Sequence, residues 1–143
     1  RNALAETFVA DSWLYAVLSG DATLAGLATG GVYAHFNPAT APTFPYVLYQ
    51  LQAPGMDTRG VGPARVMTQA LYLVRGVAQA NSFGGSLKSV ADRIDVLLQA
   101  ASGTAAGGQV LSCVREQPFA LPETGPGGLQ YRHLGGIYRL FVK

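Results

Sequence analysis

Two histidines and one cysteine are the residues of this chain best suited to bind a metal or act as a nucleophile. Metal sites need several such ligands close together. His35, Cys113 and His133 are far apart in the sequence, so we expect each to be structural and no metal to bind. Cys113 and His133 could form a nucleophilic pair if they faced each other, but the sequence places no orienting group or oxyanion hole beside them. We therefore expect no catalytic residues and no cofactor.

The glycine-rich stretch 53–65 comes close to two phosphate-binding motifs. Gly55 and Gly60 have the spacing of P-loop glycines, but Val61 stands where the lysine of that motif must supply its charge. The Gly-Val-Gly triplet at 60–62 begins a dinucleotide-binding fingerprint, but an arginine stands where its third glycine is needed. Neither motif is complete, so we interpret the stretch as a loop without a nucleotide site.

Carboxylates are sparse, and none is placed where acid–base chemistry would need it. Asp92 and Asp95 fall on the polar side of an expected helix, where we expect them to be solvated. Glu116 and Glu123 flank an expected turn. General acid–base catalysis needs a carboxylate whose pKa is shifted by burial or by a close neighbour. The sequence predicts no such pair, and we expect the protein not to be an enzyme.

The overall composition favours a protein that assembles with copies of itself. The 143 residues suit one domain, residues 1–143, with one core. Because 49% of the residues are apolar and only 13% are charged, we expect part of the surface to face other subunits. The net charge of +2, with basic residues spread along the chain, argues against a dedicated nucleic-acid-binding surface. No apolar run approaches the roughly 18 residues of a membrane-spanning helix, so we expect no membrane partner.

Two amphipathic helices are predicted. Apolar residues recur at helical spacing from Ala3 to Ser19, and Gly20 ends that pattern. Asp21 is expected to cap a short turn that follows. The clearest apolar stripe predicts a second helix over Ser86–Ala101 and consists of Leu87, Val90, Ala91, Ile94, Leu97 and Leu98.

Strands are predicted where β-branched and aromatic residues alternate with other residues. They are 32–35, 46–52, 66–77, 109–119 and 129–143. The segments 102–108 and 121–128 read as a linker and a turn, and Cys113 reads as a small buried apolar residue.

The predicted fold class is α+β, with a mainly antiparallel sheet, two main helices packed on one face and a long projecting β-hairpin. The hairpin comprises the strands 46–52 and 66–77 and a long flexible connection, Ala53–Arg65. Its second strand alternates over twelve residues, which at ~3.3 Å per residue is longer than a small core needs. We therefore expect the hairpin to reach beyond the body of the protein.

The C-terminal third carries a more specific pattern. It consists of V-L-S-C-V-R-E at 110–116, Pro-Glu at 122–123 and Y-R-H-L-G-G-I-Y-R-L at 131–140. This pattern resembles the tail-completion, or tail terminator, family of long-tailed (siphovirus-like) bacteriophages. Similar proteins occur in prophage-derived gene-transfer particles, and the sequence does not distinguish the two origins. The earlier elements follow a similar order: Leu24 and Leu27, Val32-Tyr33, Phe44-Pro45-Tyr46-Val47, Ala70–Val74 and Ile94-Asp95.

The resemblance implies a structural virion protein without enzymatic activity or cofactor. Such a protein forms a ring, by implication a hexamer, that caps the tail tube, ends tail elongation and offers a docking face to the head connector. The implied location is the head-proximal end of the virion tail, after assembly in the host cytoplasm. The implied partners are copies of the same chain, the tail tube protein, the head-connector or stopper protein, and duplex DNA that passes through the lumen without specific binding.

Six residues are candidates for contacts within the ring or with partners: Met56, Asp57, Arg59, Arg65, Arg132 and Arg139. The first four lie in or beside the tip of the expected hairpin. The last two lie on the final strand, where they could pair with Glu116 or Glu123 across a hairpin or meet acidic residues of the adjacent subunit.

Three alternatives remain open at this point. A head-closure or connector protein, or another minor tail protein at the same junction, is the nearest competitor within the structural class. A small nucleic-acid-binding module would show salt-dependent affinity for duplex DNA. A small enzyme using Cys113 and His133 would lose activity when Cys113 is alkylated.

Overall fold

The computed structural model describes residues 3–79 and 85–143. The helices are α1 (Ala3–Ser19), α2 (Ala22–Leu27) and α3 (Gly85–Leu98), with a short 3-10 turn, η2, at Pro126–Gly128. The strands are β1 (Val32–Ala34), β2 (Tyr46–Arg59), β3 (Arg65–Gln79), β4 (Ala101–Ala105), β5 (Gly108–Thr124) and β6 (Gln130–Val142).

The six strands form one sheet in the order β1-β2-β3-β6-β5-β4. Neighbouring strands pair antiparallel except β1 and β2, which run parallel. The predicted fold class is wrong: the sheet is mixed and curls into a half-barrel, and about 50% of the residues are in strands against 28% in helices. Two features of the chain explain the error. A parallel pair such as Val32 with Val47 has no local turn signal in the sequence, and α2 adds a third helix to the helical layer.

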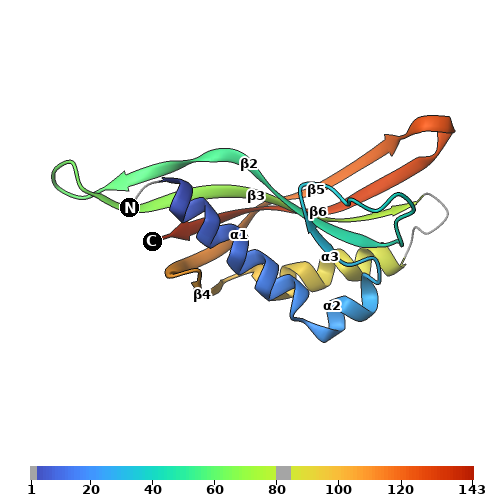
Figure 1. Cartoon of the computed structure of the whole chain (residues 1–143), viewed down its shortest axis with the longest axis horizontal. Helices are drawn as coiled ribbons and strands as arrows, with labels where there is room; N and C mark the ends of the chain where they lie inside the picture. The colour runs from blue at the N-terminus through green and yellow to red at the C-terminus, as the bar shows by residue number, and fades with distance from the viewer. Residues whose placement is uncertain (1–2, 80–84) are drawn as a thin grey trace.

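All three helices lie on one side of the sheet (Figure 1). Helix α1 contacts β1, β3, β4, β5 and β6, and α3 contacts β3, β5 and β6. The core between the two layers is built from alternating strand residues, such as Tyr72 and Val74 on β3 and Tyr138 and Leu140 on β6. We call the opposite side of the sheet, away from the helices, the open face.

Two buried tyrosines tie the helices to the central strands. The hydroxyl of Tyr72 donates to Asp11 Oδ1 on α1 at 2.6 Å, and the hydroxyl of Tyr138 donates to Asp95 Oδ1 on α3 at 3.0 Å. Burial raises the pKa of both phenols far above its usual value, and the neighbouring carboxylates add to that rise. Asp95 is therefore a structural acceptor as well as a partly solvated carboxylate, since its side chain is 35% exposed; Arg115 Nε also lies 3.8 Å from it.

The sheet is longer than its helical layer, and two hairpin ends project in opposite directions along the long axis (Figure 1). One is the end of β2 and β3 with the turn at 60–64, which we call the β2–β3 tip. The other is the far end of β5 and β6 with the turn at 125–129, which we call the β5–β6 arm. The sequence predicted a projection only at the first of these ends.

Three predicted irregular segments are wrong in their extent. The expected loop Ala53–Arg65 is mostly strand, because β2 continues to Arg59 and stays paired with β3 through several register shifts. The expected linker at 102–108 contains most of β4, and the expected turn at 121–128 contains the end of β5. In each case glycine or proline suggested a break, but pairing with a long neighbouring strand keeps the backbone extended.

Gly135 marks a place where β6 passes very close to β3. A Cβ atom at this position would lie 2.0 Å from the carbonyl oxygen of Val74 and 2.6 Å from Cα of Arg75. Both contacts are with backbone, which no change of rotamer can relieve. Gly135, the first glycine of the Gly-Gly step in the C-terminal pattern, is therefore required by the packing of the two central strands.

Replacing Gly135 with alanine should lower the free energy of unfolding by roughly 1–3 kcal/mol, because overpacking forces the backbone to shift. Urea unfolding followed by the fluorescence of Trp13, the single tryptophan, would measure it. Gly127 in the arm turn has nothing within 4 Å of an added Cβ and a φ of 73°. The Gly127→Asn variant is the control, because asparagine tolerates that conformation, and it should be nearly neutral. Equal stability of the two variants would contradict the packing argument.

Candidate functional site

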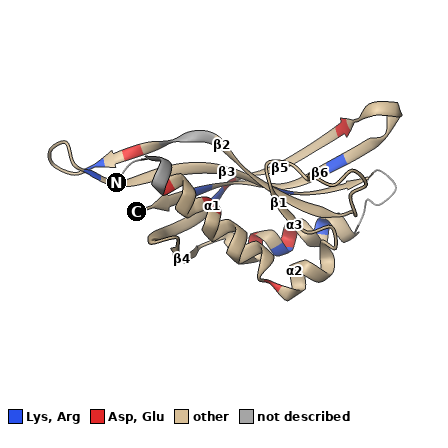
Figure 2. Cartoon of the chain, viewed as in Figure 1, with Lys and Arg blue, Asp and Glu red and all other residues tan. Residues whose placement is uncertain are grey.

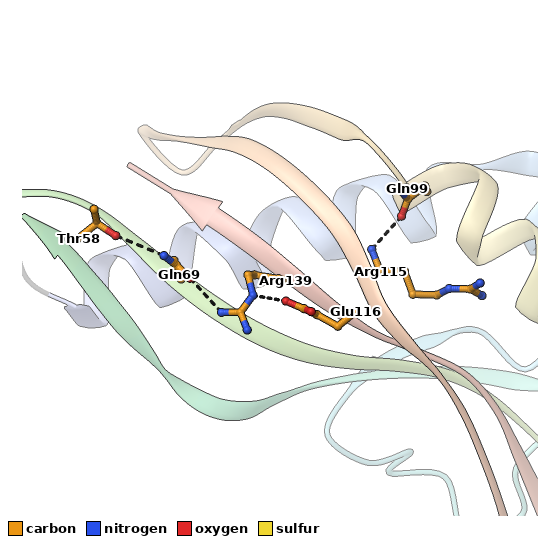
Figure 3. A network of polar contacts seen from close by, with 6 residues as sticks. All are labelled: Thr58, Gln69, Gln99, Arg115, Glu116 and Arg139. Carbon is orange, nitrogen blue, oxygen red and sulfur yellow. Dashed lines mark hydrogen bonds and ion pairs between the residues drawn. The ribbon is translucent and has the colours of Figure 1, made fainter.

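A row of polar side chains crosses four strands on the open face (Figure 3). Thr58 on β2 accepts from Gln69 on β3, with 3.4 Å between Oγ1 and Nε2. The side-chain oxygen of Gln69, Oε1, accepts a hydrogen bond from Arg139 Nη1 on β6 at 2.9 Å. Arg139 Nε donates to the carboxylate of Glu116 on β5. We call this row the first polar ladder. It confirms the predicted pairing of Arg139 with Glu116.

A second row crosses the same four strands nearer to the β5–β6 arm. Gln50 on β2 accepts from Arg75 Nη1 on β3 at 3.1 Å, and Arg75 Nε donates to Nδ1 of His133 on β6 at 3.0 Å. The other ring nitrogen of His133 lies 3.7 Å from Glu123 Oε1 on β5. We call this row the second polar ladder.

The spacing of the strand residues explains why two ladders form. Gln69 and Arg75 are six residues apart on β3, and His133 and Arg139 are six residues apart on β6. An even spacing keeps both members of each pair on one face of a strand. The antiparallel register then places each β3 residue diagonally from its β6 partner, since Gln69 is directly paired with Phe141 and Arg75 with Gly135. Diagonal neighbours remain within reach of long polar side chains.

The charges within the two ladders compensate one another. Arg139 is ion-paired with Glu116, and Arg75 and Glu123 lie on either side of His133. With a neutral His133, the two guanidinium groups and two carboxylates sum to no net charge. Arg75 is partly enclosed, and burial lowers the pKa of its guanidinium from the ordinary value. These cations are held by protein groups rather than directed toward solvent.

His133 is a buried histidine with a defined tautomer. Because Nδ1 accepts a hydrogen bond from Arg75, a neutral ring carries its proton on Nε2. That nitrogen has no hydrogen-bond partner, and only 6% of the residue is exposed. Burial lowers the pKa of His133, and Arg75 lowers it further; Glu123 opposes them without reversing the direction.

A second charged cluster lies at the base of the β2–β3 tip, on the helix side of the sheet. Glu6 of α1 is 4% exposed, and its carboxylate lies 3.4 Å from Arg65 Nε. Asp57 lies 3.8 Å from Arg65 Nη1, and the Thr68 hydroxyl lies between the carboxylates of Glu6 and Asp57, where its single proton can be donated to either. An open cavity of about 620 Å³ adjoins this cluster and continues to Gln109. Figure 2 shows acidic and basic residues together at this end of the molecule, whereas long parts of the strands carry no charged residue.

The six predicted contact residues do not form one site. Asp57 and Arg65 lie together at the base of the tip. Met56, with 63% of its surface exposed, and Arg59 lie on the tip itself. Arg132 is exposed on the β5–β6 arm, and Arg139 lies in the first polar ladder. Their roles in partner contacts stay predictions.

Cys113 and His133 do not form a nucleophilic pair. Cys113 is fully buried in the core on the helix side, which confirms its interpretation as a buried apolar residue, whereas His133 lies on the open face. Burial raises the pKa of the Cys113 thiol to about 12, so the thiolate is strongly disfavoured. Within the described residues no group of three His, Cys, Asp or Glu side chains is placed to hold a metal, and no helix has the length and apolar character to cross a membrane.

Sequence reasoning missed the second ladder and most of the first. It predicted a pairing between Arg139 and Glu116 or Glu123, but it assigned no role to Gln50, Gln69 or Arg75. The signal that could have found them is the even spacing of polar residues inside otherwise apolar strands. Polar residues at this spacing mark the side of the sheet that faces away from the helices.

No protein-family model matches the chain, and no curated protein matches it. Among solved structures, it is similar to a chain of the virion of a native gene transfer agent particle, with a TM-score of 0.68 and 18% sequence identity. That likeness covers 96% of this chain and 97% of the other. A second solved structure is similar over 78% of each chain, with a TM-score of 0.52 and 15% identity. At these identities the comparisons show a shared fold.

The buried His133 predicts a dependence of stability on pH. Its folded-state pKa lies below the ordinary value of 6.5, so the unfolded chain takes up this proton first as the pH falls. The stabilisation is therefore complete above about pH 6.5 and is lost as the pH falls toward the folded-state pKa. Urea unfolding of the wild type and His133→Asn between about pH 8 and 5 would test this, since asparagine keeps an acceptor for Arg75 without titrating in this range.

The asparagine variant should be less stable at pH 8 and should lose less stability on acidification than the wild type. The control is His35→Asn, at an exposed position with a φ of 66° that asparagine tolerates. This control should follow the wild-type pH profile. A wild-type profile in His133→Asn would show that His133 is not the group responsible.

Proposed function

We propose that this protein is a structural component of a phage-like virion that forms a ring at the head-proximal end of the tail. In this role it caps the tail tube, ends tube elongation and provides the docking face for the head connector. The observation that carries the proposal is the fold likeness to a chain of a gene transfer agent virion, which extends over nearly the full length of both chains. The resemblance of the segments 110–116 and 131–140 to the tail terminator family supports the finer assignment.

The shape of the molecule supports assembly through faces and projections. The β2–β3 tip and the β5–β6 arm point in opposite directions, so each copy offers different surfaces to the copies before and after it (Figure 1). Closed rings are built from such heterologous contacts. The part of β5 that extends beyond its pairing with β4 carries two exposed prolines, Pro118 and Pro122. Proline blocks strand addition, which disfavours open-ended edge-to-edge growth.

The outer face of α1 is the surface that we assign to contact between copies. Large apolar side chains also lie on the side of this helix that does not pack on the sheet. Phe8 is 63% exposed and Tyr15 is 51% exposed, and the two lie seven residues apart on one side of the helix. The outer face of α3 differs, because it carries the exposed ion pair between Lys88 and Asp92. A second copy covering α1 would remove two large apolar side chains from water.

The remaining partners follow from the same role. The β2–β3 tip, with Met56 and Arg59 exposed, is our candidate for contact with the tail tube protein or the head connector, while the body of each copy closes the ring. Duplex DNA would pass through the lumen without specific binding, which the low charge content and the compensated ladders favour. The protein would be assembled in the host cytoplasm and reside in the virion.

The proposal is tested by adding the purified protein to polymerising tube subunits from the same particle. Native mass spectrometry should show a closed oligomer, with six copies expected, and electron microscopy should show tubes that stop growing with a ring at one end. Addition of purified connectors should then give connector-capped tubes. Binding to connectors but not to tubes would instead favour a head-closure protein.

Substitution of Phe8 and Tyr15 by serine should weaken the ring without unfolding the subunit. Each change removes exposed apolar area that a second copy would cover, and each fully buried aromatic side chain contributes roughly 1.5–3 kcal/mol. The fraction of closed oligomer in native mass spectrometry should fall steeply, whereas the urea midpoint of the monomer should change little. Val96→Ser is the matched control, because Val96 is 67% exposed on the charged outer side of α3. Equal loss of the oligomer in Val96→Ser would contradict the assignment of α1.

A further inference from the structure

The cations of the open face are engaged by their own protein. The guanidinium of Arg139 donates to the carboxylate of Glu116 through Nε and to the side-chain oxygen of Gln69 through Nη1. Its side chain is only 29% exposed, and that of Glu116 is 42% exposed. The guanidinium of Arg75 is also held by two side chains, but these are the uncharged groups of His133 and Gln50. Both guanidinium groups are thus held by protein side chains, but a direct ion pair with a carboxylate is present only in the first ladder.

Whether a surface cation is already paired with a carboxylate affects how strongly that surface binds duplex DNA. Proteins bind the phosphate backbone mainly because Arg and Lys replace condensed counterions, and each replaced counterion strengthens binding at low salt. A guanidinium that already neutralises a carboxylate adds no net positive charge to the surface. A phosphate could recruit it only by displacing that carboxylate, which would then be left close to the phosphate. The pair between Arg139 and Glu116 therefore presents little attraction to DNA.

We propose that Glu116 is a neutralising residue, which keeps Arg139 from holding the phosphates of duplex DNA that moves across the open face. The inference rests on the proposed ring, and it assigns the open face, rather than the helical layer, to the lumen. The glutamine and threonine of the first ladder complete the surface with uncharged groups. The result is a polar wall along which a duplex slides without being retained.

The position of the helices supports this assignment. They cover only one side of the sheet, and the proposed contact between copies uses the outer side of α1 (Figure 1). The open face is then the other extended side of the sheet; it is buried around His133, and it is accessible at the first ladder, where Arg139 and Glu116 are 29% and 42% exposed. On this face Arg139 of the central strand β6 is ion-paired with Glu116, whereas the exposed pair between Lys88 and Asp92 of α3 lies on the opposite side of the molecule.

The test is a duplex-binding measurement on the assembled ring with a charge-matched control. Glu116→Gln removes the carboxylate that neutralises Arg139 and keeps the size of the side chain. Asp92→Asn removes the carboxylate of the pair between Lys88 and Asp92 on α3, where the two side chains are 75% and 63% exposed. Both variants add one positive charge per subunit, so a general effect of net charge would raise duplex affinity equally in both.

Filter binding of a labelled duplex should be measured over a range of salt concentrations. Glu116→Gln should raise the affinity about tenfold or more at roughly 50 mM salt, because each new phosphate contact adds about 0.9 to the salt slope and several copies act together. Asp92→Asn should stay close to the wild type. The double variant Glu116→Gln with Arg139→Gln should return to wild-type affinity and salt slope.

Ring formation, by native mass spectrometry, and tube capping, by electron microscopy, are measured on the same preparations. If the wild type neither forms a ring nor caps tubes, the proposed function fails. If it caps tubes but Glu116→Gln and Asp92→Asn bind duplex equally, only the present inference is overturned. A gain in Glu116→Gln that persists after Arg139→Gln would also overturn it, because the freed guanidinium would then not be the phosphate ligand.

Discussion

The antiparallel pairing of β3 with β6 is the constraint on which the rest of the structure depends. It runs through twelve residue pairs, from Thr68 with Val142 to Gln79 with Tyr131, at the centre of the sheet. Because side chains alternate between the faces of a strand, this one register fixes both surfaces at once. It directs Tyr72 and Tyr138 toward the helices and Arg75 and Arg139 toward the open face. A slip of one residue would bury the guanidinium groups in the core.

The hydroxyl groups of the two tyrosines explain how this register also places the helices. Each phenol is buried and needs an acceptor, because an unpaired buried hydroxyl destabilises the fold. Asp11 on α1 and Asp95 on α3 supply these acceptors. Helix α2 is held separately: Asp21 caps its N-terminus through Leu24, as predicted, and also accepts two hydrogen bonds from Arg93 of α3. The three helices are thus tied to the sheet and to one another by polar contacts as well as by the apolar core.

The sequence predicted those elements whose own residues determine their structure. The apolar stripe of α3 and the alternation in β3 and β6 are local patterns, and the structure contains all three elements close to the expected residues. Strand β4 (Ala101–Ala105) consists of small residues and forms because β5 supplies hydrogen-bond partners. The parallel pairing of β1 likewise depends on β2. The ladders were largely missed for the same reason, since diagonal contacts exist only once the register of four strands is known.

The scarcity of charge has a physical consequence that links assembly to the open face. Many of the charged side chains in the described residues form ion pairs within the subunit. These pairs are Glu6 and Asp57 with Arg65, Asp21 with Arg93, and Glu116 with Arg139. Surfaces compensated in this way exert only weak long-range fields, so they neither attract nor repel a highly charged polymer strongly. In the proposed ring, contacts between copies would then come from exposed apolar side chains such as Phe8 and Tyr15, whose burial is non-directional and insensitive to charge screening by salt. The proposed ring, held by apolar contacts and lined by neutralised pairs, would keep its subunits together while DNA passes through it.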